Sequence, residues 1–346
     1  MIPIRSIRIP DTNSIPRRTF VQLSTHTVAA GLATLGLSSM GLSHLELQAA
    51  SDESNQTTIR FGFIADLHQD LVPDATARLD QFLKTCLAKN PNALIQLGDF
   101  ATPIAKNKEA IELYNSIDIK KFHVIGNHDT DGGLKIAQVV DNWGMKARFY
   151  SEVVQGIKLI VLDCNEKPKN HRGGYPAHIA EEQFEWLKGE LQYPGPILVL
   201  SHQPLAGPAS IDNAVEVQKL LTTASDRILL AINGHTHIDE LLEVDGVHYW
   251  HVNSASYYWV GSQYKHESLP QEVHAKYPAM SSTCPYRDPL FAFLEIDFAR
   301  GLLTFVGRES GWIGPSPSDL GLPNNPQITP RIRARSHFRH AIRSGS

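Results

Sequence analysis

The stretch LLAINGHTHIDE, residues 229–240, runs from an apolar segment directly into Gly234-His235-Thr236-His237. Short apolar runs without polar alternation are typical of strands that are buried on both faces. Residues at i and i+2 of an extended chain point the same way, so the two histidines should project together where this strand surfaces. The pattern indicates metal binding, although a single histidine at a strand end is more often a hydrogen-bonded structural residue.

Four other apolar runs end in the same manner, each at residues that can bind a metal ion. They are IRFGFIAD (59–66), ALIQLGD (93–99), FHVIGNHD (122–129) and PILVLSH (196–202). Together the five runs deliver Asp66, His68, Asp99, Asn127, His128, Asp129, His202, His235 and His237. Any one of these motifs is common by chance, but the ordered set of five is specific.

Helical patterns separate the predicted strands, with apolar residues at three- and four-residue spacing in segments 74–89, 107–117, 180–192 and 213–224. Strands that alternate with helices favour an α/β fold with a largely parallel sheet. In such sheets the loops beyond the carboxyl ends of the strands form the site. The five polar clusters are therefore expected to converge at one edge.

The chemistry of these side chains restricts the metal. Asp, His and Asn ligands without cysteine suit Mn, Fe or Zn rather than Ca or Mg. Asp66 and His68, two residues apart, can bind one ion together. Asn127 and His128 are adjacent and should point apart, so that one can be a ligand while the other faces a different group.

This ordered set resembles the calcineurin-like metallophosphoesterase superfamily. The matching segments are DLH (66–68), GD (98–99), GNHD (126–129), SH (201–202) and GHTH (234–237). The resemblance implies a four-layer α/β/β/α sandwich, in which two mixed sheets are flanked by helices. It also implies a metal site with two ions at the carboxyl ends of the strands.

By the same resemblance, seven residues are expected to hold the two ions. They divide into Asp66, His68 and His237 for one ion, Asn127, His202 and His235 for the other, and Asp99 as the bridge between them. Two divalent ions carry four positive charges, and the two aspartates neutralise only two of them. The remaining positive field suits a phosphate ester and a bridging hydroxide.

His128 is the histidine of the set that is left without a ligand role. It resembles the family residue that donates to the phosphate or to the leaving oxygen, and its alternative is a structural histidine behind the ligands. Asp129 is expected to orient the imidazole of His128 and to favour its charged form.

The resemblance implies an enzyme: a metal-dependent hydrolase of phosphoric mono- or diesters, of alkaline-phosphatase type, that acts through a metal-bridging hydroxide. The alternative is hydrolysis of cyclic nucleotides or nucleoside diphosphates, because those relatives share GNHD and GHTH. A non-catalytic scaffold of the same fold is disfavoured, since all seven ligand positions and His128 are filled. Thr102 stands where purple acid phosphatases place a tyrosine, three residues after the bridging aspartate.

Two further segments are candidates for the rim of the site. The long aromatic segment 257–288 carries four aromatic side chains that either line a wall beside the metals or pack a strand and a surface loop; they are Tyr257, Tyr258, Trp259 and Tyr264. Segment 170–176 contains Arg172, which is either a phosphate contact or an exposed loop residue. Asp163 is a candidate for support behind the ligands.

The first fifty residues do not resemble part of the fold. Arg17-Arg18, a short apolar run and Ala49-Ala50 resemble a twin-arginine export signal, so a periplasmic or extracellular protein is expected. A targeting leader of another kind is the alternative. The run is too short and too rich in Gly and Ser for a spanning helix, so no transmembrane segment is expected in the mature form.

The remaining chain is expected to divide into a metallophosphoesterase domain, residues 51–312, and a linker with a basic tail, residues 313–346. The tail contains PRIRARSHFRHAIR, residues 330–343, with five arginines and no acid. The net charge of −4 gives no support for general nucleic-acid binding. The expected partner is a small phosphate-ester substrate.

Overall fold

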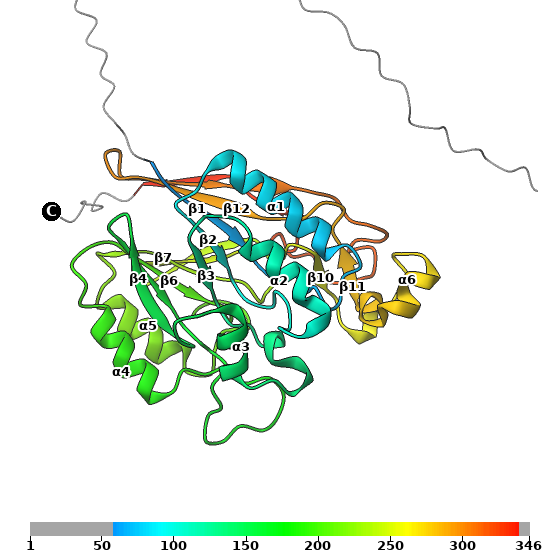
Figure 1. Cartoon of the computed structure of the whole chain (residues 1–346), viewed down its shortest axis with the longest axis horizontal. Coiled ribbons are helices and arrows are strands. Elements are labelled where there is room, and N and C mark those ends of the chain that lie inside the picture. Colours follow the sequence, from blue (N-terminus) through cyan, green and yellow to red (C-terminus); the bar gives the residue numbers. More distant parts are fainter. Residues whose placement is uncertain (1–57, 339–346) are drawn as a thin grey trace, which may run out of the picture. The chain divides into compact units, whose positions relative to one another are not determined.

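The structure is a computed structural model, which describes residues 58–338 (Figure 1). The predicted export signal, residues 1–50, lies outside the described residues. In the part of the chain that is described, none of the helices combines the length and the apolar character needed to cross a membrane.

Two six-stranded mixed sheets form the centre of the fold. The first has the order β16 (Arg335–Phe338), β13 (Leu302–Val306), β12 (Ala292–Asp297), β1 (Ile59–Ile64), β2 (Ala93–Gln96) and β3 (Lys121–His123). The second has the order β4 (Tyr150–Val154), β5 (Ile157–Val161), β6 (Ile197–Ser201), β7 (Ile228–Asn233), β9 (Val247–His251) and β8 (Glu240–Val244). Strands β1 to β3 are parallel to one another, and so are β5, β6, β7 and β9.

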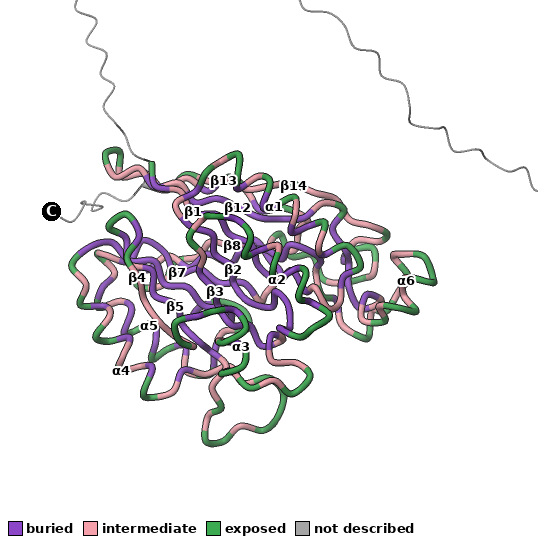
Figure 2. Tube along the Cα trace, in the orientation of Figure 1, coloured by how far each residue is buried: buried purple, intermediate pink, exposed green. Residues whose placement is uncertain are grey.

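Apolar side chains from both sheets interlock between them. Trp250 of β9 contacts Phe63 of β1 with ring centroids 5.7 Å apart, and Phe305 of β13 at 4.8 Å. All three side chains belong to one buried cluster that draws on both sheets. The buried trace in Figure 2 follows the strands of this region. Because these strands are buried on both faces, their sequences are continuously apolar and do not alternate with polar residues.

Helices cover the outer faces of the sheets. The first sheet is covered by α1 (Ala75–Lys89), α2 (Lys108–Asn115) and α3 (Ile136–Trp143), and the second by α4 (Glu181–Glu190) and α5 (Ala214–Thr222). Phe82 of α1 packs in one cluster with Leu94 and Phe293, while Leu187 of α4 packs in another with Val199. The predicted α/β/β/α sandwich is therefore confirmed (Figure 1).

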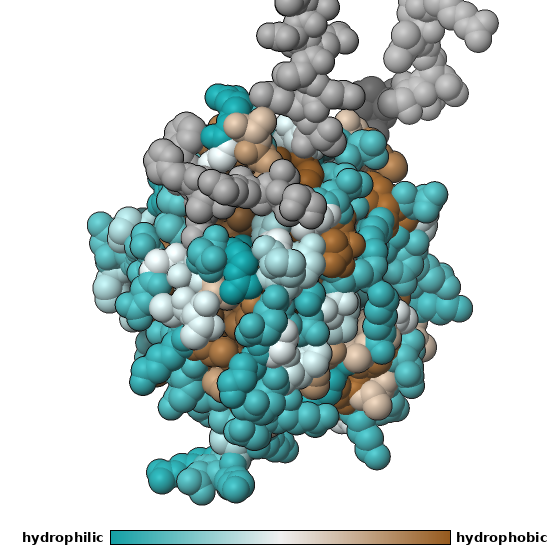
Figure 3. All heavy atoms as spheres, turned by 90° about the vertical axis from the view of Figure 1, so that its left-hand side faces the viewer, coloured by the Kyte–Doolittle hydropathy of each residue, from teal (hydrophilic) through white to brown (hydrophobic). Residues whose placement is uncertain are grey.

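Shorter elements complete the described chain. They are β10 (Tyr257–Trp259), β11 (Thr283–Pro285), β14 (Arg308–Glu309), β15 (Arg331–Ile332), α6 (Gln271–Lys276), and 3-10 turns η1 (Ala105–Asn107), η2 (His128–Gly133), η3 (Ser262–Tyr264) and η4 (Pro278–Ser282). Hydrophilic side chains predominate on the face shown in Figure 3, with apolar ones scattered between them. Such a distribution is usual for a solvent-facing surface.

The predicted boundary at residue 312 is wrong, because part of the basic tail belongs to the fold. Strand β16 pairs with β13 at the edge of the first sheet, and Ile332 of β15 is buried. Arg333 and Arg335 both bind the buried carboxylate of Asp239, at 2.9 and 2.7 Å. Two arginines are thus held in place by one acid two residues after the GHTH motif.

We expect the double substitution Arg333→Ala/Arg335→Ala to lower the free energy of unfolding by about 3 kcal/mol, because it leaves Asp239 buried without its counter-charges. Urea unfolding measures this change. Adding Asp239→Ala should restore part of the loss. Arg331→Ala is the matched control, since Arg331 is half exposed and lies 3.8 Å from Glu309. If Arg331→Ala lowered the free energy of unfolding as much as the double substitution, the pairing of Arg333 and Arg335 with Asp239 would not explain the loss.

Candidate metal centre

The predicted ligands converge where the parallel strands of both sheets end. Strands β1, β2 and β3 of the first sheet lead into the DLH, GD and GNHD segments, and β6 and β7 of the second lead into SH and GHTH. Two groups of three residues place their ligand atoms within 4.8 Å of one another. The groups are Asp66, His68 and His237, and Asp99, His202 and His235.

The first group joins side chains that are 169 residues apart in the sequence. His237 Nε2 lies 3.3 Å from Asp66 Oδ1 and 3.3 Å from His68 Nε2. The distance from His68 Nε2 to Asp66 Oδ1 is 4.0 Å. All three side chains are buried. Their grouping is the one expected from the family resemblance.

The second group is centred on His202. Its Nε2 lies 3.2 Å from Asp99 Oδ2, 3.2 Å from His235 Nδ1 and 3.1 Å from Asn127 Oδ1. The amide oxygen of Asn127 therefore adds a fourth ligand atom to the group of Asp99, His202 and His235. Asp99 Oδ2 is also 3.9 Å from His68 Nε2 of the first group. This carboxylate lies between the two groups, at the position of a bridging ligand.

The orientation of the imidazoles fits metal binding. His202 Nδ1 donates to the carbonyl of Leu97 at 2.8 Å, and His237 Nδ1 to that of Tyr257 at 2.7 Å. In the neutral imidazoles these bonds assign the proton to Nδ1 and leave the Nε2 lone pair facing the carboxylates. The ligand atoms of His202 and His237 lie 3.1–3.3 Å from their neighbours, whereas His68 Nε2 lies 3.9–4.0 Å from the two carboxylates. Ligands at about 2.1 Å from an ion are separated by about 3.0–3.4 Å, so the residues fit a pair of ions.

The electrostatics of the groups are consistent with ligand roles. Burial lowers the pKa of His68 to about 3 and that of His235 to about 4, so both imidazoles are neutral at pH 7. Burial also disfavours charge on His202, but Asp99 overrides it and raises its pKa to about 9. The two buried carboxylates therefore attract positive charge strongly, whether as a proton or as a metal ion.

The backbone at the ligands is strained. Of the nine non-glycine residues with positive φ in the described chain, five are predicted ligands. They are Asp66 (50°), His68 (51°), Asp99 (49°), His235 (67°) and His237 (51°). Left-handed backbone is unfavourable for residues with a Cβ and clusters at functional sites. The surrounding packing holds these side chains in directions that a relaxed strand would not give.

Two glycines of the motifs permit this packing. A Cβ at Gly126 would lie 2.1 Å from the backbone nitrogen of Asp99, and a Cβ at Gly234 would lie 2.7 Å from Asp66 Oδ2. Both glycines therefore allow a neighbouring segment to approach a ligand closely. The GNHD and GHTH motifs begin with glycine for this steric reason.

We expect Gly126→Ala to lower the free energy of unfolding by at least about 1–3 kcal/mol, the usual cost of overpacking. The added methyl must displace Asp99, so bound metal should fall as well. Thermal unfolding and metal content measure both effects. Gly189→Ala in α4 is the control, because the space around it is open and alanine favours a helix. A Gly126→Ala protein with unchanged stability and metal content would overturn this explanation.

The structure corrects the predicted partner of His128. His128 Nδ1 lies 2.8 Å from Asp131 Oδ2, and the hydroxyl of Tyr175 donates to Asp131 Oδ1 at 2.8 Å. Tyr175 OH is also 3.1 Å from His128 Nδ1. The prediction that Asp129 orients His128 is wrong. Segment η2 is kinked at Asp131 (φ −58°, ψ 154°), so the pairing of His128 with Asp131 depends on this local backbone, which no sequence pattern indicated.

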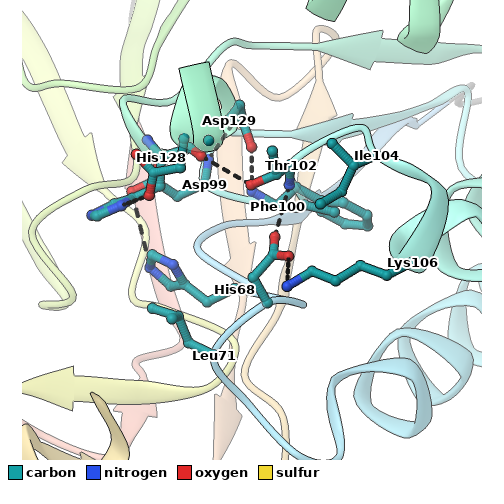
Figure 4. A pocket seen from close by; sticks show the side chains of 13 residues that line it. His68, Leu71, Asp99, Phe100, Thr102, Ile104, Lys106, His128 and Asp129 are labelled. Carbon is teal, nitrogen blue, oxygen red and sulfur yellow. Dashed lines mark hydrogen bonds and ion pairs between the residues drawn. The ribbon is translucent and has the colours of Figure 1, made fainter. Parts of the chain in front are cut away.

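Asp129 instead fastens the backbone of two ligand loops. Its buried carboxylate accepts hydrogen bonds from the amides of Phe100 at 3.0 Å and Asp99 at 3.1 Å (Figure 4). It also accepts from the amide of Gly126 at 2.7 Å. Burial, followed by the charge of Asp99, raises the pKa of Asp129 to about 7. Asp129 therefore positions the loop that carries Asp99 and has no contact with the imidazole in the described structure.

Two cavities open on the centre and share five lining residues: His68, Leu71, Asp99, His128 and Asp131. The smaller has a volume of about 190 Å³ and includes Lys106, which is paired with Asp70 at 2.8 Å (Figure 4). The larger has a volume of about 680 Å³. Residues of the centre thus line both cavities.

The lining of the larger cavity shows which of the predicted rim residues lie beside the ligands. Tyr257, Tyr258 and Trp259 line it, as predicted for the wall beside the ligands, whereas Tyr264 is not among its lining residues. From segment 170–176 the lining residue is Tyr175, not the exposed Arg172.

Asp163 lies outside both ligand groups. Its carboxylate accepts from Arg148 at 2.9 Å, and its backbone amide donates to Gln183 at 2.8 Å. Thr102 lines the smaller cavity, and its hydroxyl donates to the carbonyl of His128 at 3.3 Å. The position that could carry a tyrosine therefore supports the His128 loop instead.

Comparison with known proteins agrees with this site. Residues 59–239 match the family model of the calcineurin-like phosphoesterases, a class of metal-dependent phosphoester hydrolases. The chain belongs to the calcineurin-like phosphoesterase family, as the motifs predicted. A dimetal phosphatase from Danio rerio has the same fold, with a TM-score of 0.53 and 14% identity, over 75% of this chain and 99% of that one.

A curated relative in Rhodococcus erythropolis is named a probable cyclic nucleotide phosphodiesterase. It is 28% identical over an alignment of 193 positions, and the match covers 50% of this chain and 61% of the relative. The match therefore leaves more than a third of that protein's length without a counterpart in the alignment.

Proposed function

We propose that this chain hydrolyses phosphoric esters with two metal ions, Mn, Fe or Zn, held by the seven ligand residues. The observation that carries the proposal is the position of Asp99, whose carboxylate lies between two ligand groups at the foot of an open cavity. Two divalent ions, when bound, would polarise the phosphoryl group and lower the pKa of water. The protein supplies the ligand geometry and the surrounding groups.

The ligand residues also restrict where a phosphate can bind. Asp66 and Asp99 are both buried, Asp99 lines the cavity, and the ligand histidines are neutral when they bind metal. Two carboxylates do not compensate two divalent ions, so the loaded centre retains a positive field. An ester phosphate entering from either cavity reaches this field beside His68 and His128.

His128 is proposed as the proton donor. Its side chain is 36% exposed, and its Nδ1 is occupied by Asp131. Nε2 is therefore the nitrogen that remains to donate to a phosphate oxygen or to the departing oxygen. Asp131, fixed by Tyr175, keeps the ring in this orientation. The hydrolysis then ends with the proton on the departing alcohol.

A diester substrate, including a cyclic nucleotide, is a second candidate within the same chemistry. Two cavities meet at the centre, so both ester groups of a diester can be accommodated. The name of the Rhodococcus relative points in the same direction. A monoester needs only one of the two cavities.

The experiment compares p-nitrophenyl phosphate, bis-p-nitrophenyl phosphate and 3′,5′-cyclic AMP with protein reconstituted with Mn, Fe or Zn. We expect metal-dependent hydrolysis, and the ratio of rates distinguishes monoesterase from diesterase activity. Cleavage of cyclic AMP at a rate comparable with the diester would favour the second candidate. Absence of hydrolysis for all three esters with every metal would contradict the proposal.

We also propose export through the segment that contains Arg17-Arg18, which lies outside the described residues. The basis is the sequence pattern alone. A reporter fused to residues 1–50 should be exported, and replacing both arginines by lysine should retain it in the cytoplasm. Equal export of both fusions would contradict a twin-arginine signal.

A further inference from the structure

We propose that the larger cavity selects phosphoric esters whose organic group is an uncharged, planar ring, and that Trp259 determines this preference. The inference rests on the proposed function, because it names the class of substrate that the same site takes. It follows from the size of the cavity, from its aromatic lining and from its charge.

The cavity is much larger than a phosphate group requires. Its volume of about 680 Å³ lies within the range of roughly 300–1,000 Å³ that is usual for small-molecule sites. The ligand residues His68, Asp99, His235 and His237 form only part of its lining. The remaining space must therefore accommodate the organic part of the ester.

Aromatic rings extend from the ligands into this space. The ring of His68 stacks on Tyr257 with centroids 5.1 Å apart and an interplanar angle of 25°. The ring centroids of Tyr257 and Trp259 are 6.5 Å apart, because residues i and i+2 of β10 lie on the same side of the strand. The outer ring of this series, Trp259, is 47% exposed. A ring bound at the phosphate end can continue the series by stacking.

A second aromatic ring lines the same cavity beside His128. Tyr175 lies 4.7 Å from the His128 ring, and 51% of its surface is exposed. Among the large apolar side chains that are exposed in the described chain, Tyr175 and Trp259 are the two aromatic ones. A planar ligand that covers these rings removes apolar surface from water and adds ring stacking, and both effects favour binding.

The charge of the lining excludes a second anionic group. Lysine and arginine do not occur among the described residues that line the larger cavity. Its acidic residue outside the ligand groups, Asp131, is paired with His128 and Tyr175. Lys106 lines only the smaller cavity and is neutralised by Asp70. An organic group that bears a carboxylate or a further phosphate would meet no counter-charge there.

Binding of non-hydrolysable phosphonates to the Mn-loaded full chain tests the inference by calorimetry. Methylphosphonate and phenylphosphonate share the anionic head and differ by the ring, and 4-carboxyphenylphosphonate adds a charge to the ring. We expect phenylphosphonate to bind about tenfold more tightly than methylphosphonate, as the stacking of one ring allows. The carboxylated compound should bind more weakly than phenylphosphonate.

Variants assign the preference to Trp259. Trp259→Ala should reduce the phenyl-to-methyl ratio toward one, and Trp259→Phe should retain most of it. Leu87→Ala is the control, because Leu87 is 62% exposed and does not line the cavity. The inference is overturned if phenylphosphonate binds no better than methylphosphonate, if Trp259→Ala keeps the ratio, or if the carboxylated compound binds more tightly.

Hydrolysis of bis-p-nitrophenyl phosphate by the same preparations separates this inference from the proposed function. A ring preference in binding without hydrolysis would leave the cavity assignment standing and overturn the proposed activity. Hydrolysis without a ring preference would overturn the cavity assignment alone.

Discussion

Replacing Asp99 with asparagine is expected to lower kcat/KM for phosphoester hydrolysis by at least about 10³-fold, because several kcal/mol of transition-state stabilisation depend on the metal pair. Asp99 Oδ2 lies 3.2 Å from His202 Nε2 and 3.9 Å from His68 Nε2, so both ligand groups lose a shared charge. Asparagine keeps the shape and can still accept the hydrogen bond from the His128 amide to Oδ1. Kinetics and metal content of the purified variant measure the effect.

Asp163→Asn is the matched control for this prediction. Asp163 is as buried as the ligand carboxylates, but its partners are Arg148, Gln183 and Asn165. We expect this variant to lose stability and to retain metal content and kcat/KM. If both variants lost activity equally, the loss would be a general effect of replacing a buried carboxylate. That result would contradict a bridging role for Asp99.

Replacing His128 with alanine is expected to lower kcat by about 10²–10⁴-fold, the usual contribution of a positioned proton donor, without loss of metal. The side chain of His128 is not one of the predicted metal ligands. Its Nδ1 contacts Asp131 Oδ2 and the hydroxyl of Tyr175. The loss should be greater for an ester with a poor leaving group, such as phenyl phosphate, than for p-nitrophenyl phosphate. A donor to the departing oxygen matters most when that oxygen is basic.

Asp131→Asn extends this test to the positioning residue. We expect a smaller loss, of about 10–100-fold, with the same dependence on the leaving group, because the imidazole remains but its orientation is weakened. A structural role for His128 would give a different result: activity would fall equally for both esters and bound metal would fall with it.

Much of the fold and of the site could be predicted because the ligands occur at the ends of apolar runs. The runs that end near Asp66, Asp99 and His235 form β1, β2 and β7, and the four predicted helices correspond to α1, α2, α4 and α5. Burial on both faces makes such strands continuously apolar, and parallel strands deliver their ends to one edge. The position of the metal centre follows from these two facts.

The contacts that could not be predicted join residues far apart in the sequence. Tyr175 reaches Asp131 across 44 residues, and Arg335 reaches Asp239 across 96. A run of arginines without acids has the composition of a solvated tail, but the buried carboxylate of Asp239, the pairing of β16 with β13 and the burial of Ile332 make it part of the fold. Likewise, sequence adjacency favoured Asp129 as the partner of His128, whereas the turn directs Asp131 to it.

Titration of metal-free protein with Mn²⁺, with hydrolysis of bis-p-nitrophenyl phosphate followed at each addition, tests the central claim most directly. The arrangement of two ligand groups around Asp99 predicts activity that rises to a plateau at two equivalents, and Asp99→Asn should not reach it. Full activity in the metal-free protein, or a plateau at one equivalent with no second ion bound, would contradict a two-metal phosphoesterase.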